Sequence, residues 1–218
     1  MKLVVFDVDG TLVDSQEHIV AAMTRAFAAV DLVLPSRADL LSIIGLSLPQ
    51  AMERLAPQAA ASLHEAMVIA YKAAHNGIDA RHASPLYPGA REVLELLRER
   101  DDLLLGIATG KSRRGLTGLL AAHGLTELFV TTQVADDHPS KPHPAMLLAA
   151  VAQAGVAPQD AVIIGDTSFD MDMGRAAGTR RLGVSWGYHP IAALTAAEGL
   201  IDRFDDVPQA LAGLWGQA

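Results

Sequence analysis

Five short, unbroken apolar runs constrain the fold of this chain most strongly. They cover residues 3–6, 103–108, 128–131, 161–164 and 182–185. Continuous apolarity, unlike an alternation of apolar and polar residues, is typical of strands that are buried on both faces of a sheet. Between these runs, apolar residues recur at helical spacing over residues 90–97, 116–120 and 143–154. This alternation of strands and helices predicts an α/β fold with a parallel, doubly wound sheet.

Residues 15–83 interrupt the alternation, because they contain no convincing strand. A long amphipathic helix is predicted around residues 63–74, after shorter helical pieces that are broken at Pro35, Gly45, Pro49 and Pro57. The stretch 83–89, with two prolines and a glycine, then predicts a linker back to the sheet. We therefore expect a core of residues 1–14 and 84–218 with an inserted all-helical domain of residues 15–83.

Composition narrows the range of partners. The 218 residues include no cysteine, which excludes a disulfide framework, a thiolate zinc site and a cysteine nucleophile. The net charge of −8 disfavours binding to nucleic acid or to anionic lipid. No stretch approaches the ~18 apolar residues of a membrane span, and the first apolar run is too short for a signal peptide. We expect a cytoplasmic monomer or homodimer with a small-molecule partner, no nucleic acid and no membrane.

Acidic residues follow two of the predicted strands. In an open parallel sheet, ligands bind outside the carboxyl ends of the strands. Asp7 and Asp9 follow the first run, and Gly10 allows a sharp turn directly after them. Asp166 and Asp170 follow the run at 161–164. Asp7, Asp9 and Asp166 are therefore predicted to converge at one edge of the sheet.

A hydroxyl and a lysine are predicted at the same edge. Thr109 and Gly110 open a helix after the second run, where free backbone N–H groups favour an anion, and Lys141 precedes another helix. Taken singly, Thr109 also suits a helix cap and Lys141 an exposed surface position. Together with three acids they form an oxygen-rich site of the kind that Mg²⁺ prefers, and clustered carboxylates would repel one another without a cation. A phosphate substrate that bridges the metal and Lys141 accounts for the whole set.

Four motifs in order along the chain resemble those of the haloacid dehalogenase (HAD) superfamily of phosphotransferases. They are DVDGT at residues 7–11, Thr109-Gly110, Lys141-Pro142, and Gly165-Asp166 with Asp170. The inserted helical segment resembles the cap of the phosphoglycolate phosphatase-like branch, so the resemblance covers the chain from end to end. It implies a Rossmann-like parallel-sheet core, a mobile helical cap and dependence on Mg²⁺.

The resemblance also implies roles in catalysis. Asp7 would be the nucleophile that forms an aspartyl-phosphate, and Asp9 the general acid that protonates the leaving group and then activates water. Thr109, Gly110 and Lys141 would hold the transferring phosphoryl group.

Roles at the metal follow in the same way. Asp7, the backbone carbonyl of Asp9 and Asp166 would hold Mg²⁺. Asp170 would lie outside the direct metal ligands and would orient water or Lys141. Asp172 lies off that helix face and is interpreted as a solvated acid.

The activity implied by the resemblance is Mg²⁺-dependent hydrolysis of a small phosphate monoester. A sugar-phosphate mutase of the β-phosphoglucomutase type and a pyrophosphatase are the alternatives, although His18 falls one residue short of that mutase's early histidine. Dehalogenase activity is disfavoured because that branch lacks the second acid, Asp9. A catalytically silent binding protein is disfavoured because all four motifs are present. Residues that select the substrate are expected within 15–83, with 43–50 as candidates.

Overall fold

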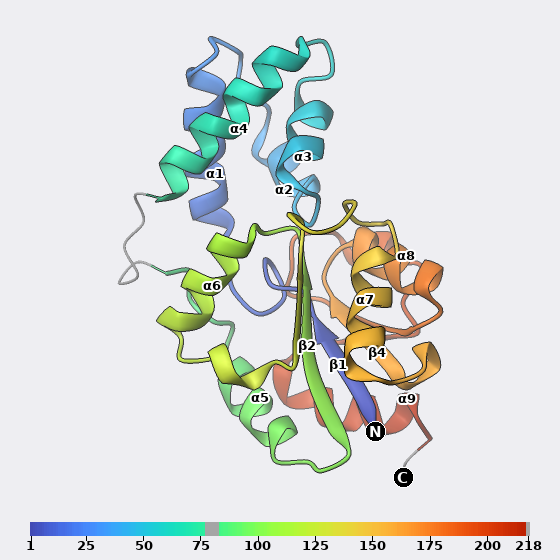
Figure 1. The fold of residues 1–218 in the computed structure, drawn as a ribbon. Coiled ribbons are helices and arrows are strands. Elements are labelled where there is room, and N and C mark those ends of the chain that lie inside the picture. Colours follow the sequence, from blue (N-terminus) through green and yellow to red (C-terminus); the bar gives the residue numbers. More distant parts are fainter. Residues whose placement is uncertain (77–82, 217–218) are drawn as a thin grey trace.

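The computed structural model describes residues 1–76 and 83–216, and within these residues six parallel strands form one sheet. The strands are β1 (Lys2–Phe6), β2 (Leu103–Thr109), β3 (Thr131–Val134), β4 (Ala161–Gly165), β5 (Arg180–Val184) and β6 (Gly199–Ile201). Their order is β3-β2-β1-β4-β5-β6, so the chain adds strands on one side of β1 and then on the other (Figure 1). The predicted α/β class with a parallel sheet is confirmed.

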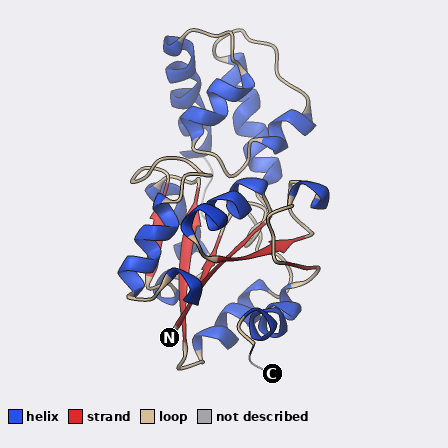
Figure 2. Cartoon of the chain, turned by 90° about the vertical axis from the view of Figure 1, so that its right-hand side faces the viewer, coloured by secondary structure: helices blue, strands red, loops and turns tan. Residues whose placement is uncertain are grey.

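Alternate side chains of β1 enter two separate hydrophobic clusters, one on each face of the sheet. Val4 and Phe6 pack with α5 (Ala90–Arg98), α6 (Arg113–Ala122) and α9 (Val207–Leu214). Leu3 and Val5 pack with α7 (Ala145–Ala154) and α8 (Ser168–Ala177) on the other face. Helices therefore cover both faces (Figure 2), which explains why the strands are apolar without alternation.

The strand predicted at residues 128–131 is wrong. Leu128 ends a short 3₁₀ helix, Thr126–Leu128, and its side chain joins the core from a turn. The strand begins at Thr131 and is largely polar. Its Thr131 and Gln133 side chains can be buried because they hydrogen-bond to Gln153 of α7. The sixth strand, β6, was not predicted, since it is only three residues long and Leu200 is exposed.

Among the described residues, four helices lie between β1 and α5: α1 (Gln16–Ala28), α2 (Arg37–Ser42), α3 (Leu48–Leu55) and α4 (Ala61–Asn76). They share a hydrophobic cluster of their own, which includes Met23, Phe27 and Met52. We call these four helices and their loops the cap; they lie beyond the carboxyl ends of the strands (Figure 1). Pro49 stands in the first turn of α3 and does not break a helix there.

The end of the predicted insertion, residues 77–82, lies outside the described residues. None of the helices among the described residues is both long and apolar enough to cross a membrane.

Helix α5 offers a matched test of the core. Leu94 is fully buried, whereas Leu96 on the same helix is 51% exposed. We expect Leu94→Ala to lower the free energy of unfolding by about 2–5 kcal/mol, because it removes packed methyl groups and leaves a cavity. Leu96→Ala should change it by less than about 0.5 kcal/mol. Urea denaturation of both variants measures the difference, and equal losses would contradict the packing described here.

Candidate active site

Asp7 stands directly after β1, where its backbone N–H extends the pairing with β4 by donating to the carbonyl of Ile164 (2.9 Å). Its side chain is buried. Gly10 follows with a φ of 85°, and a Cβ at this position would collide with the carboxylate of Asp166. Only glycine therefore allows the turn after β1 to pass so close to the acid that follows β4.

A buried lysine joins two of the predicted acids. The ammonium of Lys141, in the loop before α7, donates to Asp7 Oδ1 at 2.7 Å and to Asp170 Oδ1 at 2.6 Å. All three side chains are almost completely buried. Burial alone would lower the pKa of Lys141, but the carboxylates of Asp170 and Asp7 raise it above its ordinary value. Lys141 is therefore held in its charged form.

Asp170 is itself fixed by the start of α8. The backbone N–H and the hydroxyl of Thr167 donate to Asp170 Oδ2 at 3.1 and 2.6 Å, and the Asp170 N–H donates back to the Thr167 hydroxyl. This reciprocal capping box satisfies the first turn of the helix. Both oxygens of Asp170 thus accept hydrogen bonds, one from Lys141 and one from Thr167.

Asp166 completes a cluster of three carboxylates. It accepts hydrogen bonds from the Thr11 hydroxyl (2.9 Å) and from the Tyr188 backbone N–H (2.8 Å). Oxygens of Asp7, Asp166 and Asp170 lie within 4.8 Å of one another. Burial and the neighbouring charges of Asp7 and Asp170 raise the pKa of Asp166 well above its ordinary value. Burial likewise raises the pKa of Asp7 to about 7, and Lys141 only partly offsets this.

The cluster fits a hard divalent cation. Three buried carboxylates face one buried ammonium, so two negative charges are unbalanced when all four groups are ionised. Asp7 Oδ2 is buried and has no hydrogen-bond partner among the described residues. Oxygen donors with excess negative charge are what Mg²⁺ prefers. Asp7 can hold such an ion through Oδ2. Each oxygen of Asp166 accepts one uncharged donor, whereas Asp170 pairs with Lys141 through Oδ1 and accepts two donors at Oδ2.

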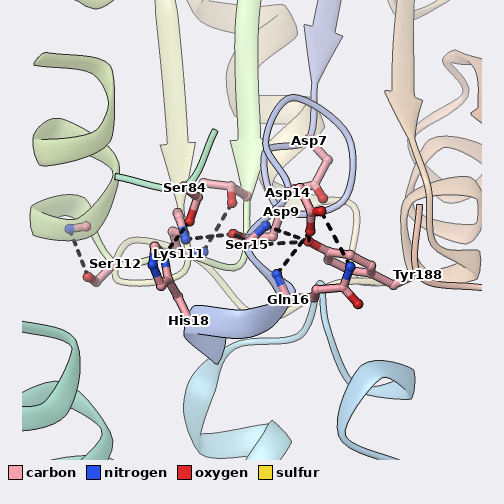
Figure 3. A network of polar contacts seen from close by, with 12 residues as sticks. Asp7, Asp9, Asp14, Ser15, Gln16, His18, Ser84, Lys111, Ser112 and Tyr188 are labelled. Atoms are coloured by element: carbon pink, nitrogen blue, oxygen red, sulfur yellow. Dashed lines mark hydrogen bonds and ion pairs between the residues drawn. The ribbon is translucent and has the colours of Figure 1, made fainter. Parts of the chain in front are cut away.

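Asp9 points to a different part of the site. Asp9 Oδ1 accepts hydrogen bonds from the Ser15 hydroxyl (2.5 Å) and from Lys111 Nζ (2.7 Å). Figure 3 shows these side chains meeting near the Tyr188 ring. Asp9 also lines a cavity of about 430 Å³ between the cap and the sheet. The structure thus separates Asp9, which faces the cavity, from the cluster around Lys141.

Thr109 ends β2, next to β1, and Gly110 follows it. The prediction that they open a helix is wrong, because α6 begins at Arg113 with Ser112 as its cap. The Thr109 side chain is fully buried, and its hydroxyl accepts a hydrogen bond from the Lys111 backbone N–H (3.2 Å). A Cβ at Gly110 would lie only 2.5 and 2.7 Å from the carbonyl oxygens of Leu46 and Gly45. Glycine therefore permits close contact between this loop and the cap, within the 43–50 segment singled out in the sequence.

Several contacts were not predicted. Lys111 is not among the predicted site residues, although its position two residues after Thr109 is a usable signal that it lies near the site. Tyr188 contacts Asp166 through its backbone, and its hydroxyl accepts the Ser15 N–H (2.7 Å). Nothing in the local sequence indicated these contacts, because they join residues far apart in the chain. Asp172 is partly exposed and pairs with Arg175 at 2.8 Å, away from the cluster.

Comparisons with known proteins agree with this architecture. Residues 4–184 match the family model for haloacid dehalogenase-like hydrolases. A relative named "Probable phosphatase IndB", from Dickeya dadantii, is 33% identical over 94% of this chain and 91% of its own length. A phosphoglycolate phosphatase from Haemophilus influenzae is 32% identical over 86% of this chain and 87% of its own length.

Solved structures show the same fold. A hydrolase from Pseudomonas syringae is 26% identical, with a TM-score of 0.86 over 98% of this chain and 99% of that one. A β-phosphoglucomutase from Clostridium difficile superposes with a TM-score of 0.83 over 100% of this chain and 98% of that one, but at 17% identity it indicates the fold alone. On the match of the family model and the extent of these similarities, the chain belongs to the haloacid dehalogenase-like hydrolase family.

Proposed function

We propose that this protein is a Mg²⁺-dependent phosphatase that hydrolyses a small phosphate monoester through an aspartyl-phosphate on Asp7. The observation that carries the proposal is the Asp7 carboxylate, which is buried, oriented by Lys141 through one oxygen and without a partner at the other among the described residues. Relatives that are named phosphatases support the same reaction class.

In the first step, an oxygen of Asp7 attacks phosphorus and the bond to the leaving-group oxygen breaks. Asp9 gives its proton to the departing alkoxide. In the second step, Asp9 takes a proton from water as the water attacks the aspartyl-phosphate, which releases inorganic phosphate and restores Asp7. The position of Asp9 at the wall of the cavity suits both proton transfers.

The remaining residues supply positive charge and orientation. Lys141 and the segment Thr109 and Gly110 at the end of β2 would hold the phosphoryl oxygens, and Asp170 keeps Lys141 in place. Asp7, Asp166 and the Asp9 carbonyl would hold Mg²⁺, which when bound offsets the repulsion between an anionic carboxylate and an anionic phosphate.

The cavity supports a small phosphorylated metabolite as the substrate. Its walls come from the core on one side, with Asp9 and Lys111, and from the cap on the other, with Ile43 and Leu46. The leaving group would therefore lie between the two parts. We propose residues 15–83 as the lid that selects it.

Replacing the nucleophile tests the covalent step. Asp7→Asn is expected to lower kcat by roughly 10³-fold or more, because an amide is a poor nucleophile of nearly the same shape. Asp172→Asn is the matched control, since Asp172 pairs only with Arg175 among the described contacts, and it should keep the parent rate. Phosphate release from a panel of esters with Mg²⁺ measures both. Turnover by Asp7→Asn near the parent rate would exclude Asp7 as the nucleophile.

Removal of metal should make stability depend on pH. In the metal-free protein, burial raises the pKa of Asp7 from 3.8 to about 7. Between pH 3.8 and about 7, the folded protein therefore binds more protons than the unfolded one. The free energy of unfolding should therefore fall as the pH rises through this window. Mg²⁺ should raise the melting temperature more at pH 8 than at pH 5, because it binds the ionised carboxylates.

Two variants complete the metal experiment. Asp7→Asn should show a weaker pH dependence in chelator, and Asp166→Asn should need more Mg²⁺ for half-maximal stabilisation and activity. Thermal melts and phosphate release measure these effects. Full activity of the parent in excess chelator would contradict the metal requirement.

A further inference from the structure

We propose that Lys111 is a positioning residue for Asp9, and that it holds the side chain where Asp9, in its protonated form, can give its proton to the leaving-group oxygen. The inference rests on the proposed function and extends it to a residue outside the four sequence motifs. It assigns different tasks to the two lysines of the site. Lys141 serves the reacting phosphoryl group, and Lys111 serves the acid on the side of the leaving group.

The contact between Lys111 and Asp9 is short and shielded. Their side chains meet at 2.7 Å and are only 11% and 12% exposed. Both residues line the cavity between the cap and the core. An ion pair in this setting is screened less by water than one on the open surface.

Two hydrogen bonds fix the position of the Lys111 backbone. The Lys111 N–H donates to the Thr109 hydroxyl (3.2 Å), and its carbonyl accepts the N–H of Ala135 (3.1 Å). The loops after β2 and β3 therefore set where the ammonium can reach. Lys111 is anchored in the same segment as the proposed phosphate-binding residues Thr109 and Gly110.

A second donor reaches the same carboxylate oxygen from another element. The Ser15 hydroxyl, directly before α1 of the cap, donates to Asp9 Oδ1 at 2.5 Å. A general acid must lie within hydrogen-bond reach of the atom that it protonates, and small misplacements are costly. Two donors from different elements restrict rotation of the Asp9 side chain (Figure 3).

Lys141 does not duplicate this arrangement. Its ammonium is buried between Asp7 and Asp170 and is not among the residues that line the cavity. Loss of Lys111 should therefore affect protonation of the leaving group and spare attack on phosphorus, a selective defect that general loss of structure would not produce.

Two classes of ester separate these effects. The 4-nitrophenolate ion leaves readily without a proton, whereas an alkoxide needs one. We compare 4-nitrophenyl phosphate with whichever of phosphoglycolate, glycerol 3-phosphate and glucose 6-phosphate the parent hydrolyses fastest. The measured quantity is kcat/KM, which covers the steps up to the aspartyl-phosphate and leaves out its hydrolysis.

The expected result is a selective loss. Lys111→Met should lower kcat/KM on the alkyl ester roughly 10- to 100-fold more than on the aryl ester. This is less than the ~10²–10⁴-fold of general acid catalysis itself, because Asp9 is still present. Lys111→Arg should restore part of the ratio, because it keeps a cation at that place. Ser15→Ala should shift the ratio in the same direction as Lys111→Met.

Two controls make the experiment specific. Lys2 pairs with Asp160 at 2.6 Å at the opposite end of β1, so Lys2→Met removes a comparable ion pair and should leave the ratio unchanged. In an Asp9→Asn background, Lys111→Met should have no further effect on the ratio, because the group that it positions is gone.

An equal loss on both esters would overturn the positioning role, and so would an unchanged effect in the Asp9→Asn background. Thermal melts test whether each variant is folded. If Lys111→Met does not fold, the kcat/KM ratios of Lys111→Arg and Ser15→Ala test the positioning role instead. A parent protein that releases phosphate from neither class of ester would overturn the proposed function itself, which is a different result.

Discussion

The buried ammonium of Lys141 is the interaction on which the rest of the site depends. A charge taken out of water is costly unless partners surround it, and here Asp7 and Asp170 are those partners. They come from the end of β1 and from α8, so the pair of contacts ties three separate segments together. Removal of one partner from such a buried pair typically costs 3–5 kcal/mol. The geometry at Asp7 is therefore coupled to the stability of the core.

That arrangement leaves an excess of negative charge, because Asp166 adds a third buried carboxylate. The fold maintains this unfavourable cluster through backbone constraints. Gly10 admits the turn that faces Asp166, and the Tyr188 N–H together with the Thr11 hydroxyl holds that carboxylate. Carboxyl groups whose pKa is raised by burial and by mutual repulsion are typical of functional sites. A bound cation would offset the repulsion among these carboxylates.

The sequence was most informative where acidic residues directly follow an apolar strand. Asp7 and Asp166 were predicted to converge because parallel strands end at the same edge of a sheet, and β1 and β4 are indeed neighbours. The contact of Lys111 with Asp9 joins residues 102 positions apart and was not predicted. No local pattern encodes such a distant pairing. The edge strand β3 was misplaced for a related reason, since its polar residues are satisfied by Gln153 of α7.

Contacts of Tyr188 link the cap to both halves of the site. Its side chain packs against the hydrophobic cluster of the cap, its hydroxyl accepts the Ser15 N–H and its backbone N–H donates to Asp166. Ser15 in turn holds Asp9 and immediately precedes α1. A displacement of α1 would therefore alter the surroundings of the proposed acid directly and those of the carboxylate cluster through Tyr188. Because α1 begins immediately after Ser15, which donates to Asp9, the position of the cap and the orientation of the proposed acid are linked through this one residue.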